Sequence, residues 1–174
     1  MSSPFKQRTT LYSLIIVCVI IETGFAIFTA LMNGFAPLPF IFGPITATFS
    51  ILTLVWTSVL LAFNNRPTSE HTLTRARIHF RSMLCMAVIF VACAIMYSTQ
   101  LPPDCNTQQP DGSDGWSGLW CGFDSTVGTL AYIIAILSSA AAFVIRRATP
   151  DFSTNVCAAD RKHVDGSVVL KEMA

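Results

Sequence analysis

The chain has 174 residues, of which 52% are hydrophobic and only 12% are charged. The charged share is about half that of an average soluble domain, so the composition excludes an ordinary water-soluble domain of this length. The formal net charge is +1. Overall charge therefore indicates neither a nucleic-acid partner nor an acidic protein partner, and we expect no nucleic acid to bind.

Apolar residues are concentrated in four long runs. Each run comes close to the about 20 residues that a helix needs to cross a hydrocarbon layer. The first run exceeds the roughly 7–15 apolar residues of a signal peptide, so we expect it to stay as a membrane anchor. Because lipid offers no hydrogen-bond partners, each run should be helical. The predicted spans are 11–31, 41–63, 83–101 and 127–145.

The positions of the basic residues predict the orientation of these spans. The chain has 11 Lys and Arg residues, and the segments 32–40 and 102–126 contain none of them. By the positive-inside rule, both termini and the 64–82 loop should face the cytoplasm. The predicted fold is an all-α, antiparallel bundle of four transmembrane helices in the plasma membrane or the endomembrane system. Its parts are a cytoplasmic N-terminus over 1–10, a transmembrane domain over 11–147 and a disordered cytoplasmic tail over 148–174.

Cysteine positions agree with this orientation. Cys105 and Cys121 are the only pair in a segment assigned to the outside, where an oxidising environment favours a disulfide. Cys157 lies in the predicted tail and is a candidate for palmitoylation, because tail cysteines near a membrane are sometimes modified in this way. The remaining cysteines fall within spans, where we expect them to pack as small apolar side chains.

The segment 102–126 is predicted to be the largest feature outside the membrane. Asp104, Asp111, Asp114 and Asp124 make it acidic. The run from Asp111 to Gly115 resembles the start of a calcium-binding loop but lacks the glutamate expected at its twelfth position. We therefore predict neither a bound metal nor another cofactor.

Glu22 is the one acidic residue inside a predicted span, close to mid-membrane, where an ionisable group suggests a functional role. Thr46, Ser50, Thr53 and Thr57 follow a helical spacing on span two. Since spans one and two run in opposite directions, Glu22 should lie level with Ser50 and Thr53. A protonated Glu22 that hydrogen-bonds to this face is the leading interpretation, and a proton or ion pathway or a contact with a partner protein are the alternatives.

Span four carries small side chains at helical spacings of three and four. Such a face lets another helix backbone approach closely. The neighbouring helix can belong to the same chain or to a second copy, so homo-oligomerisation stays open. The residues are Gly128, Ala131, Ala135, Ser138, Ser139 and Ala142.

The predicted cytoplasmic loop 64–82 is basic. Ser69 can cap a helix that starts near Glu70 and runs on into span three. That helix would hold Arg75, Arg77 and Arg81 at the level of the lipid headgroups, where they can attract anionic inner-leaflet lipids. His71 and His79, in the same loop, match no known metal-binding spacing.

The sequence lacks the common short catalytic motifs. It contains no Gly-x-Ser-x-Gly, no Cys-x-x-Cys, no His-Glu-x-x-His and no phosphate-binding loop. We therefore predict that the protein is not an enzyme.

The layout of spans and loops resembles that of MARVEL-domain proteins, particularly small fungal ones, over about residues 8–147. The local features are Arg81 before span three, the pair Cys105 and Cys121, and the run that contains Cys121-Gly122-Phe123-Asp124, Ala131-Tyr132-Ile133 and Ala142-Phe143-Val144. A weaker resemblance links Trp116-Ser117-Gly118-Leu119-Trp120-Cys121 to the claudin signature, which claudins carry in the first outer loop rather than the last.

The resemblance to MARVEL-domain proteins implies membrane apposition, vesicle trafficking or the organisation of lipid domains, without shared catalytic residues. The expected function is accordingly that of a non-catalytic membrane-organising protein. Its expected partners are membrane lipids, a second copy of the chain or other membrane proteins. The alternative is a transport or channel component that uses Glu22.

Overall fold

A computed structural model describes residues 4–32, 37–64, 75–104 and 114–148. These residues form four α-helices, and each is long and apolar enough to cross a membrane. This finding confirms the predicted all-helical, multi-pass class of membrane protein. The helices are α1 (Pro4–Met32), α2 (Pro37–Asn64), α3 (Ala76–Asp104) and α4 (Asp114–Ala148).

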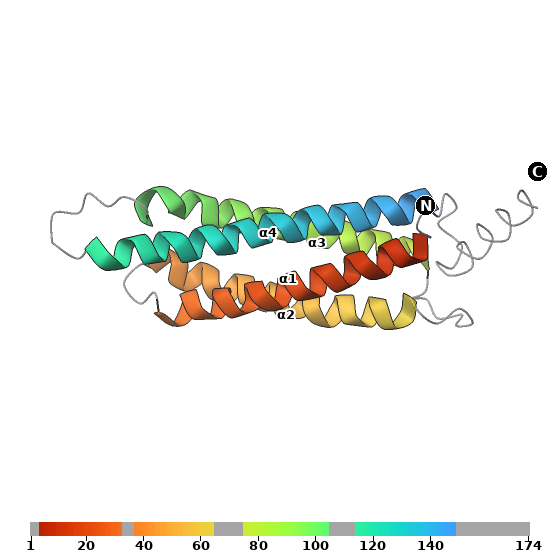
Figure 1. Cartoon of the computed structure of the whole chain (residues 1–174), viewed down its shortest axis with the longest axis horizontal. Coiled ribbons are helices and arrows are strands. Elements are labelled where there is room, and N and C mark those ends of the chain that lie inside the picture. Colours follow the sequence, from red (N-terminus) through yellow and green to blue (C-terminus); the bar gives the residue numbers. More distant parts are fainter. Residues whose placement is uncertain (1–3, 33–36, 65–74, 105–113, 149–174) are drawn as a thin grey trace, which may run out of the picture.

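The helices lie lengthwise beside one another, and the colours of Figure 1 reverse direction from each helix to the next. Contacts are most extensive between α3 and α4 and between α1 and α2, followed by α1 and α4. Contacts between α2 and α3 are much sparser. The packing order around the molecule is therefore α2, α1, α4, α3, with the loosest seam between α2 and α3.

Every helix extends beyond the span predicted for it. The first begins at Pro4 and the third at Ala76, before the membrane spans predicted to start at residues 11 and 83. The predicted spans correspond to the thickness of the hydrocarbon layer. A helix can continue beyond that layer for as long as its backbone hydrogen bonds are favourable. At the start of α3, the backbone N–H of Ile78 donates to the Arg75 carbonyl over 3.0 Å. The predicted start near Glu70 lies outside the described residues.

The largest correction concerns the predicted outer loop 102–126. Residues up to Asp104 belong to α3, and residues from Asp114 onward belong to α4, a helix of 35 residues. Glycines and prolines in this segment favour a loop on local propensity. Tertiary contacts outweigh that preference in α4, because the Phe123 ring packs on Phe28 with ring centres 4.8 Å apart.

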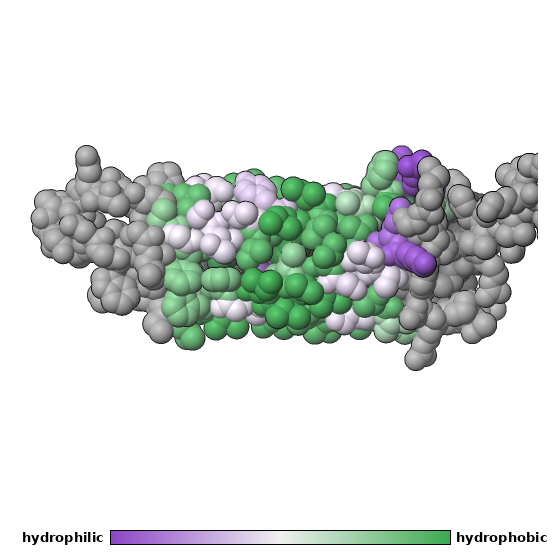
Figure 2. Space-filling view, viewed as in Figure 1, coloured by the Kyte–Doolittle hydropathy of each residue, from purple (hydrophilic) through white to green (hydrophobic). Residues whose placement is uncertain are grey.

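Apolar side chains cover the outside of the molecule as well as its interior. In Figure 2 the middle of the molecule is green, and purple residues gather at the end that holds the start of α1. Val88 on α3 is 64% exposed and Ile136 on α4 is 67% exposed. A soluble protein rarely exposes so continuous an apolar surface, whereas lipid covers it without cost.

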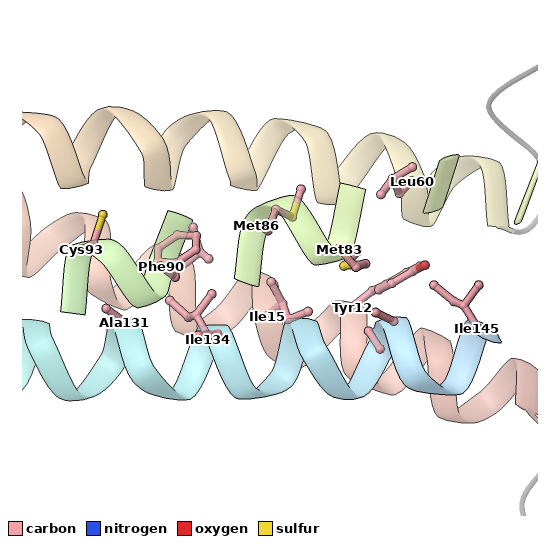
Figure 3. Packing of buried hydrophobic residues seen from close by; sticks show 14 of the residues in the cluster. Tyr12, Ile15, Leu60, Met83, Met86, Phe90, Cys93, Ala131, Ile134 and Ile145 are labelled. Carbon is pink, nitrogen blue, oxygen red and sulfur yellow. The ribbon is translucent and has the colours of Figure 1, made fainter. Parts of the chain in front are cut away.

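Larger aliphatic and aromatic side chains fill the interior from all four helices. Phe90 from α3 and Ile134 from α4 lie close together in the interior, and Ile15 and then Tyr12 from α1 follow along the axis of the bundle (Figure 3). Each of these residues is fully buried.

Candidate functional site

A buried hydrogen bond joins Glu22 on α1 to Ser50 on α2. The Ser50 hydroxyl donates to Glu22 Oε2 over 3.2 Å, and both residues are fully buried. The predicted contact between Glu22 and Ser50 is therefore present. Glu22 Oε1 is also buried and has no hydrogen-bond partner among the described residues. A neutral carboxyl group, which carries its proton on one oxygen, suits this apolar setting better than a carboxylate.

The predicted hydroxyl face of α2 points into the protein. Thr46, Ser50 and Thr57 are fully buried, and Thr53 is 6% exposed. The Thr57 hydroxyl faces the Met86 sulfur on α3 at 3.8 Å. Thr53 lines a groove toward α3, so its predicted proximity to Glu22 stays a prediction.

Polar groups from the other helices extend this buried region. Tyr97 on α3 is 1% exposed, and its hydroxyl lies near Thr29 on α1 and Thr46 on α2 but forms no hydrogen bond with a described residue. Glu22 and Asp124 both lie within electrostatic range of Tyr97. Sequence reasoning missed Tyr97, although a tyrosine within a predicted membrane span was a usable signal. We call Glu22, Thr29, Thr46, Ser50, Tyr97 and Asp124 the interior polar cluster.

Asp124 corrects the sequence analysis directly. It was assigned to an acidic outer loop, but it lies in α4 and is fully buried. The burial of Asp124 was missed because the predicted span began at residue 127. A residue assigned to a loop is not placed on a helix face, so the sequence gives no expectation for its burial. The interior polar cluster thus contains two carboxyl groups, from α1 and α4, instead of the single one predicted.

A second buried polar group lies at the end of the bundle where α1 begins. The Tyr12 hydroxyl and His79 Nδ1 are 3.0 Å apart, and the two rings stack. His79 lies in α3, within the segment predicted to be helical from near Glu70 into span three, but its full burial was not predicted. Arg8, expected in a polar lead segment, lies in α1 and is also fully buried. The helices reach past the predicted spans here, so these side chains enter the interior.

The face of α4 that carries small side chains packs against another helix of the same chain. Gly128, Ala131 and Ser138 are buried, whereas Ser139 is exposed. A Cβ added at Gly128 would lie 3.3 Å from the Tyr97 Cβ, which shows how closely α3 approaches. Intramolecular packing therefore accounts for much of this face. Homo-oligomerisation stays a prediction.

A closer approach, not predicted from the sequence, occurs between α1 and α2. A Cβ added at Gly43 would lie 2.8 Å from the Ala30 Cβ and 3.0 Å from the Ala26 carbonyl oxygen. Only glycine fits there without a shift of one helix. This contact holds α1 and α2 together beside Thr29 of the interior polar cluster.

The arginines at the start of α3 lie on the surface of the protein. Arg75, Arg77 and Arg81 are all exposed. Arg81 also borders an open groove between α2 and α3. Whether these residues bind anionic lipid stays a prediction.

The cysteines divide into two groups. Cys18, Cys85 and Cys93 are free thiols. Cys121 lies in α4, not in a loop, and is disulfide-bonded. Cys105 and Cys157 lie outside the described residues, so the pairing of Cys121 with Cys105 and the palmitoylation of Cys157 stay predictions. The predicted disordered tail, 148–174, also lies outside them apart from Ala148.

The arrangement at the interior polar cluster links helices and gathers protonatable groups. Within the described ranges, no three His, Cys, Asp or Glu side chains come together as a metal-binding group would. Comparison of the chain with protein-family models, curated proteins and solved structures gave no match.

Proposed function

We propose that the protein is a non-catalytic, four-span membrane protein that organises membrane domains or takes part in membrane trafficking. In this proposal the helices form an antiparallel bundle with both termini and the basic ends of the helices in the cytoplasm. The layout that resembles MARVEL-domain proteins supports this assignment. So does the surface of the molecule, which offers lipid an apolar middle and a basic end.

The observation that carries the proposal is the use made of the intramembrane polar groups. Glu22 bonds to Ser50 on the neighbouring helix and is fully buried. An interhelical hydrogen bond of this kind contributes about 0.6 kcal/mol on average and holds a bundle together. A structural use of Glu22 leaves the outer surface, rather than the interior, as the part that contacts lipids and partners.

Co-purification from native membranes in a mild detergent tests the proposal. We expect other integral membrane proteins, a second copy of the chain or selected lipids to remain bound. Chemical cross-linking in intact cells should place the same neighbours beside it before extraction. A protein that stays monomeric and has no recurring neighbour would contradict a membrane-organising role.

Transport is the second candidate function, and Asp124 is the observation that favours it. A second buried carboxyl group within electrostatic range of Tyr97 gives the interior two protonatable sites. Intramembrane carboxyl groups often form proton relays. A flux assay in reconstituted vesicles, with Glu22→Gln and Asp124→Asn, separates the two functions. Proton or cation flux that both variants abolish would favour transport, and flux at the level of protein-free vesicles would favour the organising role.

A further inference from the structure

An open groove runs between α2 and α3, where these helices pack least closely. Its volume is about 500 Å³, within the range of small-molecule sites in proteins. The walls are almost entirely apolar. We call it the α2–α3 groove; its lining residues are Phe49, Leu52, Thr53, Trp56, Arg81, Ser82, Cys85, Met86 and Ile89.

Among the described residues that line this groove, Arg81 alone is charged, and it lies toward the end of the molecule where α1 and α3 begin, which we call the basic end. Arg81 comes five residues after α3 begins at Ala76, and Ile89 lies about 12 Å further along the helix at 1.5 Å per residue. On α2, Trp56 is closer to the basic end than Phe49 is, because α2 ends there at Asn64. The groove therefore has a cationic mouth and an apolar body that leads toward mid-membrane.

Arg81 is exposed and forms no hydrogen bond or ion pair with another described residue. The acidic residues in the described ranges are remote from it along the helices. Asp104 ends α3 and Asp114 begins α4, both at the opposite end, and Asp124 lies ten residues into α4 from that end. Glu22 is buried against Ser50 on α2. The charge at the mouth of the groove thus lacks a counter-ion from the described protein.

From these features we infer that the α2–α3 groove binds one phospholipid with an anionic headgroup. Its headgroup, which has a net negative charge where that of phosphatidylcholine has none, lies against Arg81, and an acyl chain lies along Trp56, Met86 and Ile89. A guanidinium group binds a carboxylate or phosphate through paired hydrogen bonds, and the apolar walls suit an acyl chain that is already in the membrane. The orientation proposed above puts the mouth in the inner leaflet, where anionic lipids are concentrated.

The inference names a lipid partner for the proposed function and rests on that function only for the choice of leaflet. Binding can be measured on purified protein, without any readout of membrane organisation. If the protein binds this lipid but has no recurring neighbours in cells, the proposed function is contradicted and this inference is not. If the protein has recurring neighbours in cells but no lipid selectivity, this inference is contradicted and the proposed function is not.

Fluorescence quenching at Trp56 is the direct test. The chain has three tryptophans, so Trp116→Phe and Trp120→Phe leave Trp56 as the single reporter. The protein is reconstituted into vesicles that contain phosphatidylserine or phosphatidylcholine with brominated acyl chains. We expect phosphatidylserine to occupy the groove about fivefold more strongly, the selectivity that one favourable arginine contact gives. Soluble glycerophosphoserine, which lacks acyl chains, should not reduce that quenching.

Matched variants separate the groove from the general positive charge of this end. Arg81→Gln should bring the selectivity close to one, whereas Arg77→Gln, on the same helix but outside the groove, should preserve it. Cys85→Phe should fill the groove and reduce quenching by both lipids, and Val88→Phe, on the outer surface of α3, should not. Circular dichroism confirms that each variant is helical. Equal quenching by both lipids, or equal losses in Arg81→Gln and Arg77→Gln, would overturn the inference.

Discussion

At the residue scale, the contact between Glu22 and Ser50 shows how a carboxyl group is accommodated in a membrane bundle. Glu22→Gln keeps the shape of the side chain and its ability to accept from Ser50. We therefore expect Glu22→Gln to fold and insert normally. Glu22→Leu loses the hydrogen bond, and it should destabilise the protein by about 1 kcal/mol, because Ser50 can bond to its own helix. Thermal unfolding in detergent measures both variants.

The protonation state of Glu22 is a separate prediction. Burial in an apolar interior disfavours the charged form, so the carboxyl group should be neutral at pH 7. Infrared difference spectra of the wild type and Glu22→Gln should then show a carbonyl band of a protonated acid. A carboxylate band in its place, or loss of function in Glu22→Gln while folding is normal, would move the transport alternative to first place.

The disulfide is also a residue-scale prediction. Cys121 is disulfide-bonded, and we expect Cys105 to be its partner. Both should resist alkylation until a reductant is added, as mass spectrometry of the labelled protein can show. Closing a loop of about 15 residues stabilises a protein by roughly 3 kcal/mol, so Cys105→Ser should lower surface abundance while the helices remain inserted. Alkylation of Cys105 in the non-reduced protein would refute the pairing.

At the scale of elements, glycines set how closely the helices approach. Gly43 faces Ala30 and the Ala26 carbonyl without room for a methyl group, whereas Gly24 has no atom within 4 Å of an added Cβ. Gly43→Ala should destabilise the protein by about 1–3 kcal/mol, the usual result of overpacking. Gly24→Ala, on the exposed face of α1, should be neutral or slightly stabilising.

The pair Gly128 and Gly122 extends the same measurement to α4. An added Cβ at Gly128 meets Tyr97 at 3.3 Å, so Gly128→Ala should have a smaller effect than Gly43→Ala. Gly122 has open space, and Gly122→Ala serves as its control. Denaturant titrations should rank Gly43→Ala as most destabilising, then Gly128→Ala, with both controls near wild type. An equal loss at all four positions would mean that helix approach is not the cause.

The sequence predicts the helices well because hydrocarbon thickness and backbone hydrogen bonding leave few alternatives. It predicts Glu22 beside Ser50 for the same reason, since two short-linked helices place these residues at one depth. It fails where local composition and tertiary packing disagree. Asp124 follows a segment whose glycines and prolines are typical of a loop, yet contacts such as Phe123 with Phe28 keep its surroundings helical.

The position of His79 was beyond sequence reasoning for a related physical reason. Charged neighbours at Arg75, Arg77 and Arg81 indicate an exposed segment, but a helix turns one of its faces inward. His79 lies on the inward face and meets Tyr12 from a helix 67 residues away in the chain. Similarly, the α2–α3 groove depends on the sparse packing between two particular helices. The residue pattern of α2 or of α3 taken alone does not predict the groove between them.

At the scale of the whole molecule, the asymmetry of charge is the main feature. In the described residues the basic side chains lie where α1 and α3 begin and where α4 ends, which is one end of the molecule. These are Lys6, Arg8, Arg75, Arg77, Arg81, Arg146 and Arg147. The opposite end joins α1 to α2 and α3 to α4 through segments that lack Lys and Arg. The positive-inside rule then gives one orientation for all four helices together.

Cysteine accessibility in intact cells tests that orientation most directly. Glu70→Cys and Ser113→Cys are introduced one at a time into a chain whose free cysteines are replaced by serine. A membrane-impermeant maleimide is added before or after the plasma membrane is permeabilised. We predict that position 113 is labelled from outside in intact cells and that position 70 is labelled only after permeabilisation. Labelling of position 70 but not position 113 in intact cells would contradict the account.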